Sequence, residues 1–297
     1  MNTIHARQSD FNFRHGCCAR TPSARWLARM RTSELVNLIY FFLFTLLALV
    51  WALPSRSRTK AVWTGAAGVG LTVTASASDQ WLMPYAAGIL RDWLPILLMP
   101  LAYWQSGCFF QKANPKLQAI FENSERRILH ALRVDSNKWA RTWVGGLLEL
   151  EYVFCYPVVP LGVAALYSSG FRSEADEYWT VVLLSAYPCY VLLPFVQLLP
   201  PRLVEGTDAS TNRSPYLRRF NLWLVRRVTH EANTFPSGHV AASAAIALVL
   251  FRFAPAAGIV FAFIAVGIAA GCIVGRYHYI VDVGAAFILA AIIFAIV

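Results

Sequence analysis

The sequence carries few charged residues for its length. Only 14% of the 297 residues are Asp, Glu, Lys or Arg, whereas soluble globular domains carry about 25%. Hydrophobic residues make up 57% of the chain and aromatic residues 14%, and aromatic rings collect at membrane interfaces. This composition argues against a soluble enzyme and indicates that lipid is the main solvent. Because each span needs roughly 20 residues, we predict an all-α fold, a polytopic transmembrane helix bundle of about seven or eight spans.

Cysteine is also scarce, and its spacing matches neither a zinc site nor a disulfide framework. Four of the six cysteines lie in or beside apolar runs. We expect these four to be buried as small hydrophobic residues. The sequence therefore predicts neither a metal site nor a bound cofactor.

Acidic residues are outnumbered by basic ones, 16 against 26, which gives a net charge of +10. The basic residues gather in the segments between apolar runs, and none of these segments resembles a nucleic-acid-binding module. We therefore expect no nucleic acid partner. Basic segments beside membrane spans favour contact with anionic lipid headgroups and help to set the topology.

The apolar runs divide the chain into three predicted regions. Residues 1–33 form a basic polar tail, residues 34–90 contain accessory membrane segments, and residues 91–297 form a membrane core of six spans. In segment 108–141, apolar residues recur at helical spacing, which predicts an amphipathic helix lying on anionic lipid. A helix that docks on a cytosolic partner is the alternative. Segment 202–235 is predicted to be a basic connector between two spans.

Three polar clusters interrupt the C-terminal part of this core. The motif Pro-Ser-Gly-His occupies residues 236–239, where the connector enters a span, and segment 275–282 follows two further apolar stretches. A chain that crosses the bilayer twice returns to the face it left, so both clusters are expected on one face. The Pro-Pro-Arg run at 200–202 begins the connector and is expected on the same face.

The residue types in these clusters suit a phosphate ester. Arg202 and Arg276 can form bidentate contacts with phosphate oxygens. Ser237 and Gly238 can present a hydroxyl and backbone N–H groups at a helix N-terminus, which is a natural anion site. These four residues are the predicted phosphate-binding residues.

Two histidines and one aspartate supply the predicted catalytic groups. Of His239 and His278, one can attack phosphorus while the other protonates the leaving oxygen. Asp282 follows His278 by four residues, so the two side chains share a helical face. Its carboxylate can hold one imidazole nitrogen protonated and leave the other as the nucleophile.

These motifs resemble those of the type-2 phosphatidic acid phosphatase superfamily. The motif at 236–239 matches the second signature of that superfamily in full, and His278-x-x-x-Asp282 matches the end of its third signature. The resemblance covers roughly residues 195–297. It implies a phosphatase-like membrane core that needs no metal, with His239 as general acid, His278 as nucleophile and Asp282 orienting the nucleophile. It also implies that Arg202, Arg276, Ser237 and Gly238 bind phosphate.

The chain departs from the superfamily pattern in two places. The first signature usually runs Lys, six residues, Arg-Pro, whereas Phe195 stands in the lysine position here and Leu203 follows Arg202. The arginine of the third signature usually precedes the histidine by six residues, whereas Arg276 precedes His278 by two. This compact form is similar to the branch of inositol-phosphorylceramide and sphingomyelin synthases, which transfer a phospho-headgroup between lipids.

Three functions remain open at this point. The leading hypothesis is a membrane-embedded phosphatase for lipid phosphates or pyrophosphates with a phosphohistidine intermediate at His278. The alternatives are a lipid phosphotransferase that uses the same site and a non-catalytic phosphate-binding membrane protein. In each case we expect an integral multi-pass protein, most simply of the cell membrane. The face that carries the site is left open, because the superfamily habit favours the outer face and the basic segments favour the cytoplasm.

Several neighbours of the motifs are expected to have no part in the chemistry. Tyr277 and Tyr279 are predicted to be interfacial aromatic residues. His230 and Glu231 are predicted to lie on the surface. Asn233 is predicted to hold the connector through a local side-chain turn.

Overall fold

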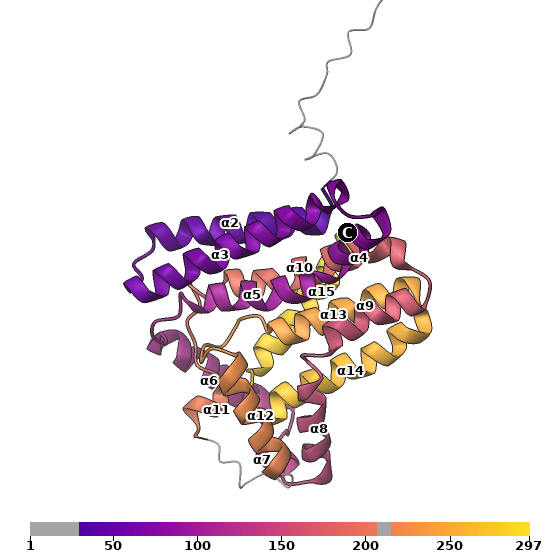
Figure 1. The fold of residues 1–297 in the computed structure, drawn as a ribbon. Helices are drawn as coiled ribbons and strands as arrows, with labels where there is room; N and C mark the ends of the chain where they lie inside the picture. Colours follow the sequence, from indigo (N-terminus) through magenta and orange to yellow (C-terminus); the bar gives the residue numbers. More distant parts are fainter. Residues whose placement is uncertain (1–29, 207–214) are drawn as a thin grey trace, which may run out of the picture. The chain divides into compact units, whose positions relative to one another are not determined.

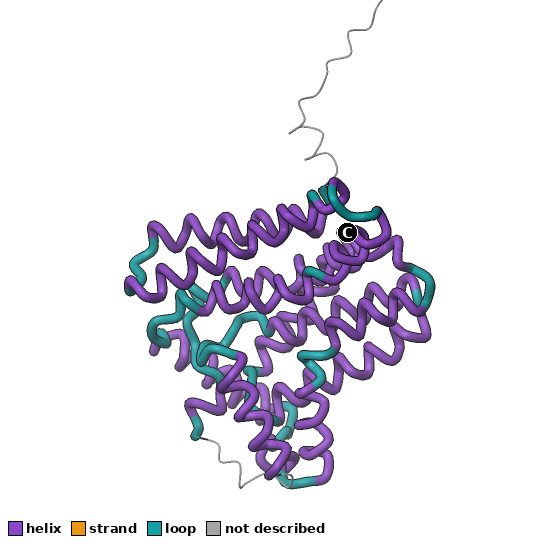
Figure 2. Tube along the Cα trace, in the orientation of Figure 1, coloured by secondary structure: helices purple, strands orange, loops and turns teal. Residues whose placement is uncertain are grey.

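The computed structural model describes residues 30–206 and 215–297. Most of the predicted basic tail and residues 207–214 of the predicted connector lie outside the described residues. The chain divides into two units between Met30 and Arg31, and all the elements below belong to the second unit. The described residues form helices and no β-strand apart from one isolated bridge between Leu198 and Asn233 (Figure 2). The predicted all-α fold is confirmed.

Two helices form the first hairpin, α2 (Thr32–Val50) and α3 (Ser55–Ser76) (Figure 1). They pack against each other and, through α3, against α5 (Pro95–Gly107). α3 is rich in Gly, Ala, Ser and Thr, and small residues let helix backbones approach closely. These small residues accordingly lie against α2 and α5. A short helix, α4 (Pro84–Trp93), links α3 to α5.

The core is built around α13 (Gly238–Phe253). It packs against α10 (Ala175–Val191), α14 (Pro255–Val274) and α15 (Ile280–Ile296). Most residues of α13 are buried, because its many alanines allow neighbours on several sides. α14 starts directly after α13, so the two helices form a hairpin whose return brings the chain back beside the start of α13.

A bent helix pair supplies another wall of the bundle. α8 (Trp143–Val153) and α9 (Val158–Ser168) meet at an angle of 71° across a four-residue break. Pro157 stands at the start of α9 and cannot donate a backbone hydrogen bond, which accounts for the break. The remaining α-helices of the described residues are α6 (Pro115–Ala131), α7 (Ser136–Ala140), α11 (Pro201–Val204) and α12 (Pro215–Val228). Of these, α7 and α12 contact α8, and α6 contacts α15.

Within the described residues, two helices are long and apolar enough to cross a membrane, namely α2 and α14. A third span results if the bent pair α8–α9 counts as one. α13 and α15 are shorter apolar helices. The expected number of seven or eight spans stays a prediction.

A close approach between α2 and α3 makes a testable difference between two glycines of α3. A Cβ on Gly68 would lie 2.5 Å from ring atoms of the buried Phe41, whereas a Cβ on Gly70 would meet nothing within 4 Å. We expect Gly68→Ala to destabilise the protein by about 1–3 kcal/mol through overpacking. Gly70→Ala should be stabilising by about 0.5–1 kcal/mol, because alanine favours the helix. Unfolding in mild detergent, followed by tryptophan fluorescence, measures both; equal effects would contradict the packing.

Candidate active site

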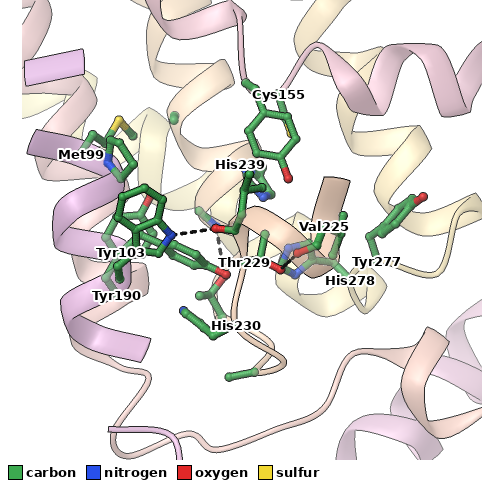
Figure 3. A pocket seen from close by; sticks show the side chains of 18 of the residues that line it. Met99, Tyr103, Cys155, Tyr190, Val225, Thr229, His230, His239, Tyr277 and His278 are labelled. Atoms are coloured by element: carbon green, nitrogen blue, oxygen red, sulfur yellow. Dashed lines mark hydrogen bonds between the residues drawn. The ribbon is translucent and has the colours of Figure 1, made fainter. Parts of the chain in front are cut away.

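His239 and His278 lie together at one end of the core. His239 is in the first turn of α13, and His278 ends the loop between α14 and α15. Their ring centroids are 6.1 Å apart, edge to face (Figure 3). This separation lets both imidazoles contact one phosphate group. The convergence that the sequence predicted from the two crossings between the histidines is present in the structure.

The aspartate expected to orient His278 is fully buried. Asp282 Oδ2 lies 3.4 Å from His278 Nδ1 and accepts a 2.9 Å hydrogen bond from the backbone N–H of Tyr279. It also accepts a 2.8 Å hydrogen bond from the side-chain amide of Asn233. An imidazole that donates from Nδ1 to this carboxylate has its Nε2 lone pair available as a nucleophile.

Asn233 joins segments that are distant in the sequence. Its backbone N–H donates to the carbonyl of Leu198 over 2.8 Å, and its side chain reaches Asp282. The predicted local turn at Asn233 is wrong, because its amide makes a long-range contact instead. Two further backbone bonds, from Ser237 N–H to the Asp282 carbonyl (3.1 Å) and from Arg202 N–H to the Arg276 carbonyl (2.9 Å), join the same three clusters.

Arg202 is the cation that faces the histidines. Its guanidinium lies 5.6 Å from the centre of the Tyr277 ring, and the side chain lines the same cavity as His239 and His278. Among the described residues no carboxylate lies within ion-pair distance of it. Arg202 is therefore placed to bind an anion between the two imidazoles.

Arg276 lies elsewhere, in a clamp of carboxylates. Its guanidinium is 2.5 Å from Glu125 Oε1, and two further nitrogens donate to Glu205. Glu125 also accepts a 2.7 Å hydrogen bond from the Ile280 N–H at the start of α15. Arg276 does not line the cavity of the two histidines. The structure thus brings Arg202, but not the Arg276 side chain, to the predicted phosphate site.

The backbone of Arg276 explains part of this difference. Its φ angle is +58°, a left-handed conformation that is uncommon for a residue other than glycine. The turn at 275–277 directs the guanidinium away from His278, where Glu125 and Glu205 hold it. Burial raises the pKa of the Glu125 carboxyl above its usual value, although the hydrogen bond from Ile280 N–H and the charge of Arg276 oppose this shift.

A second buried network supports the loop from the other side. Glu149 accepts hydrogen bonds from Arg218 (2.9 Å), Asn221 (2.5 Å) and the Tyr277 hydroxyl (2.8 Å). Arg218 also donates to the Gly275 carbonyl over 2.8 Å. This buried carboxylate, with Arg218, thus fixes the loop that carries His278.

The two tyrosines beside His278 are buried rather than interfacial. Tyr277 and Tyr279 are each 1% exposed, so the predicted interfacial positions are wrong. The Tyr279 hydroxyl accepts a 2.6 Å bond from Gln118 and donates to the Leu199 carbonyl over 3.2 Å. Through Gln118 and Glu125, α6 therefore packs on the site; whether its other face lies on lipid stays a prediction.

Ser237 and Gly238 begin α13 next to the histidines. Gly238 lines the cavity, and a Cβ there would lie 2.8 Å from the Tyr190 ring, so glycine permits the close packing. The Gly238 N–H donates weakly to the Thr234 hydroxyl at 3.4 Å. Ser237 is fully buried and is not in the cavity lining. The free N–H groups of the first turn belong to a 16-residue helix, whose dipole favours an anion there.

A cavity of about 280 Å³ connects these residues to the helices around them. Its other walls come from α5, the break between α8 and α9, α10, and the end of α12 with the loop that follows it. Aromatic residues in these walls include Tyr103, Tyr156 and Tyr190. His230 also lines it, and both ring nitrogens are buried, so its predicted surface position is wrong. Glu231 is exposed, as predicted. No group of three His, Cys, Asp or Glu side chains in the described ranges could hold a metal ion.

The clamp around Arg276 yields a prediction about folding. Removing one partner of a buried ion pair costs about 3–5 kcal/mol. We expect Glu125→Ala to approach this loss and to speed hydrogen exchange at the start of α15, since Ile280 N–H loses its acceptor. Glu231→Ala, at an exposed carboxylate of the connector, is the control. Unchanged exchange at α15 in Glu125→Ala would show that the clamp does not hold this helix.

One of three comparisons with known proteins gave a match. A family model described as the PAP2 superfamily, the type-2 phosphatidic acid phosphatases, matches residues 125–296. No curated protein and no solved structure matches the chain. The matched residues cover more than half of the sequence and include the Pro-Ser-Gly-His motif, His278 and Asp282. With its apolar helices and this match, the chain is a membrane protein with a phosphatase-like site, and it belongs to the PAP2 superfamily.

Proposed function

We propose that this protein is a membrane-embedded phosphatase of lipid phosphates or pyrophosphates that works through a phosphohistidine at His278. The observation that carries the proposal is the 6.1 Å pairing of the His239 and His278 rings, with Asp282 behind His278. Family membership supports phosphatase-like chemistry. The lipid substrate and the residue roles are our inference from this geometry.

The first step transfers the phosphoryl group to the protein. The Nε2 lone pair of His278 attacks phosphorus while Nδ1–H donates to Asp282. The bond from phosphorus to the ester oxygen breaks, and His239 gives its proton to that oxygen, so that the lipid alcohol leaves neutral. General acid catalysis of this kind contributes about 10²–10⁴-fold to rate.

The second step releases the phosphate. His239, now neutral, removes a proton from water, and the oxygen of that water attacks phosphorus. The phosphorus–nitrogen bond breaks, inorganic phosphate leaves, and both histidines return to their starting protonation states. His239 thus acts as the acid in the first step and as the base in the second, while His278 is first the nucleophile and then the leaving group.

The phosphate oxygens need positive charge and N–H donors throughout. Arg202 and the first turn of α13 are placed to supply them beside the two imidazoles. Arg276 is held by two carboxylates, so in this proposal it positions the loop of His278 and the start of α15 instead of binding substrate.

Two substitutions separate the roles of the histidines. His278→Asn should abolish both turnover and labelled phosphoenzyme, because the nucleophile is missing. His239→Asn should lower turnover of an alkyl phosphate about 10²–10⁴-fold. It should still form phosphoenzyme with 4-nitrophenyl phosphate, whose leaving group needs no proton. Quench experiments with labelled substrate in buffer containing a chelator measure both quantities.

The control is His130→Asn, which changes an exposed histidine of α6. It should behave as the unchanged protein. Phosphoenzyme formation in His278→Asn would overturn the assignment of the nucleophile, and loss of all activity in chelator would overturn the metal-free route.

Transfer to a lipid hydroxyl is the second candidate. It follows the same first step, after which an alcohol replaces water as the group that attacks the phosphohistidine. The specific observation in its favour is the cavity, whose aromatic and apolar walls continue past the two histidines along α5 and α12. Such a space can hold the hydroxyl end of an acceptor.

We also propose that α12 contacts anionic lipid. Three aromatic side chains of this helix are exposed, at Tyr216, Phe220 and Trp223. Arg219 and Arg227 lie over the rings of Tyr216 and Trp223 at 5.9 and 5.7 Å. Aromatic rings and arginines on one amphipathic helix are typical of a helix lying in the membrane interface.

Removing the charges of this helix tests the contact. Replacing Arg219, Arg226 and Arg227 with Gln should abolish most of the extra hydrogen-exchange protection that α12 gains in anionic over neutral nanodiscs, because anionic headgroups lose their partners. Replacing Arg56, Arg58 and Lys60 with Gln removes the same charge from the start of α3 and is the control. An equal loss of this protection in both variants would show an effect of net charge alone and would contradict a specific contact at α12.

A further inference from the structure

The cavity at the two histidines is larger than a phosphate group requires. Its volume of about 280 Å³ equals that of roughly nine water molecules at about 30 Å³ each. A phosphate group at His239, His278 and Arg202 fills only one part of it. The remaining part lies between α5, the start of α9 and the loop after α12.

Polar atoms without a hydrogen-bond partner gather in this second part. The Tyr156 hydroxyl and both ring nitrogens of His230 are buried and have no partner among the described residues. The backbone of Tyr103 is close enough to act on the His230 ring electrostatically, but it does not meet hydrogen-bond geometry with either ring nitrogen. Buried polar atoms are normally paired, so unpaired ones around a cavity indicate the position of a ligand.

Ring contacts are present at both ends of this part of the cavity. His239 and Tyr156 have ring centroids 5.7 Å apart. Tyr103 stacks on His230, with centroids 4.1 Å apart and the planes at 20° (Figure 3), and it lies within electrostatic range of Tyr156. Tyr156, His230 and the two histidines line one cavity, so a group bonded to the phosphate, or attacking it, shares this space with Tyr156 and His230.

The charge of this part of the cavity limits what it can bind. In the described portion of the chain, no Asp or Glu lines the cavity, and Arg202 is its one Lys or Arg. Burial lowers the pKa of His230 to about 4, so its ring is neutral near pH 7. A quaternary ammonium group could contact the aromatic rings of the cavity, but it would leave the hydrogen-bonding atoms of Tyr156 and His230 unpaired. A second anion would find no second cation.

We infer that Tyr156 and His230 form a second subsite, which binds a neutral, hydroxyl-bearing group next to the phosphate. A hydroxyl can donate to one nitrogen of His230 or accept from it, and it can pair with the Tyr156 hydroxyl in either sense. The Tyr103 ring forms an apolar face for the carbon atoms of the same group. This inference rests on the proposed function for the identity of the phosphate site beside it.

Two sources can supply such a hydroxyl. It can belong to the headgroup of a phosphodiester donor: His278 then displaces the lipid alcohol, which takes the proton of His239, and the headgroup stays on the phosphohistidine. Alternatively, it can belong to an acceptor alcohol: His239 removes its proton, its oxygen attacks phosphorus, and the phosphorus–nitrogen bond breaks. The chemistry of the subsite is the same in both cases.

The experiment compares His230→Phe and Tyr156→Phe in the full-length protein. His230→Phe keeps a ring against Tyr103, and Tyr156→Phe removes a single oxygen atom. The donor arm measures kcat/KM for dodecyl phosphoglycerol relative to dodecyl phosphocholine. The acceptor arm uses dodecyl phosphate and measures the fraction of phosphoryl groups transferred to 1-dodecylglycerol instead of water.

We expect each variant to lower the ratio in at least one arm by about 3- to 10-fold, the effect of one lost hydrogen bond. A change in the donor arm assigns the hydroxyl to the headgroup, and a change in the acceptor arm assigns it to the acceptor. The control variants are His130→Phe and Tyr85→Phe, at exposed positions. Ratios unchanged in both arms would overturn the subsite.

A binding measurement keeps this inference separate from the proposed function. Calorimetric titration of dodecyl phosphoglycerol into His278→Asn and into His278→Asn with Tyr156→Phe needs no turnover. Weaker binding in the double variant supports the subsite even if no phosphohistidine forms. Equal binding in the two proteins counts against the subsite whatever the catalytic result.

Discussion

The position of every proposed catalytic group depends on one buried oxygen atom, Oδ2 of Asp282. It faces His278 Nδ1 and accepts hydrogen bonds from Tyr279 N–H and from Asn233. A buried carboxylate is tolerated only when such partners surround it, so the connector at Asn233 and the loop at 278–279 must come together at the start of α15 for the fold to be stable. The aspartate therefore holds these segments together in addition to its proposed role of orienting His278.

The arginines near this carboxylate divide into two kinds. Arg202 faces the cavity, whereas Arg276 and Arg218 are bound by carboxylates on either side of the loop that carries His278. Buried guanidinium–carboxylate pairs hold a backbone in place and leave little positive charge for a ligand. The site thus combines a rigid surround of paired charges with a cavity of low net charge, which suits a substrate whose other parts are neutral.

Much of this arrangement could be predicted from the sequence. The other predictions were wrong for physical reasons that the structure identifies. The helical class, the pairing of His239 with His278 and the position of Asp282 follow from local motifs and from chain crossings. The side-chain directions of Arg276, Tyr277 and Tyr279 do not, because a positive φ angle and partners more than 100 residues away determine them. The prediction that His230 lies on the surface is wrong because only the fold shows that α5 covers it.

The residues matched by the family model begin at 125, yet α5 ends before that point and forms one wall of the cavity with Tyr103. The proposed reacting groups, with Tyr156 and His230, therefore lie within the matched stretch, whereas one wall of the same cavity comes from the chain before it. Exchange of the residues before α6 between related proteins would change this wall and leave the proposed reacting groups in place. Chimeric proteins joined between α5 and α6 would separate the contributions of these two stretches of chain.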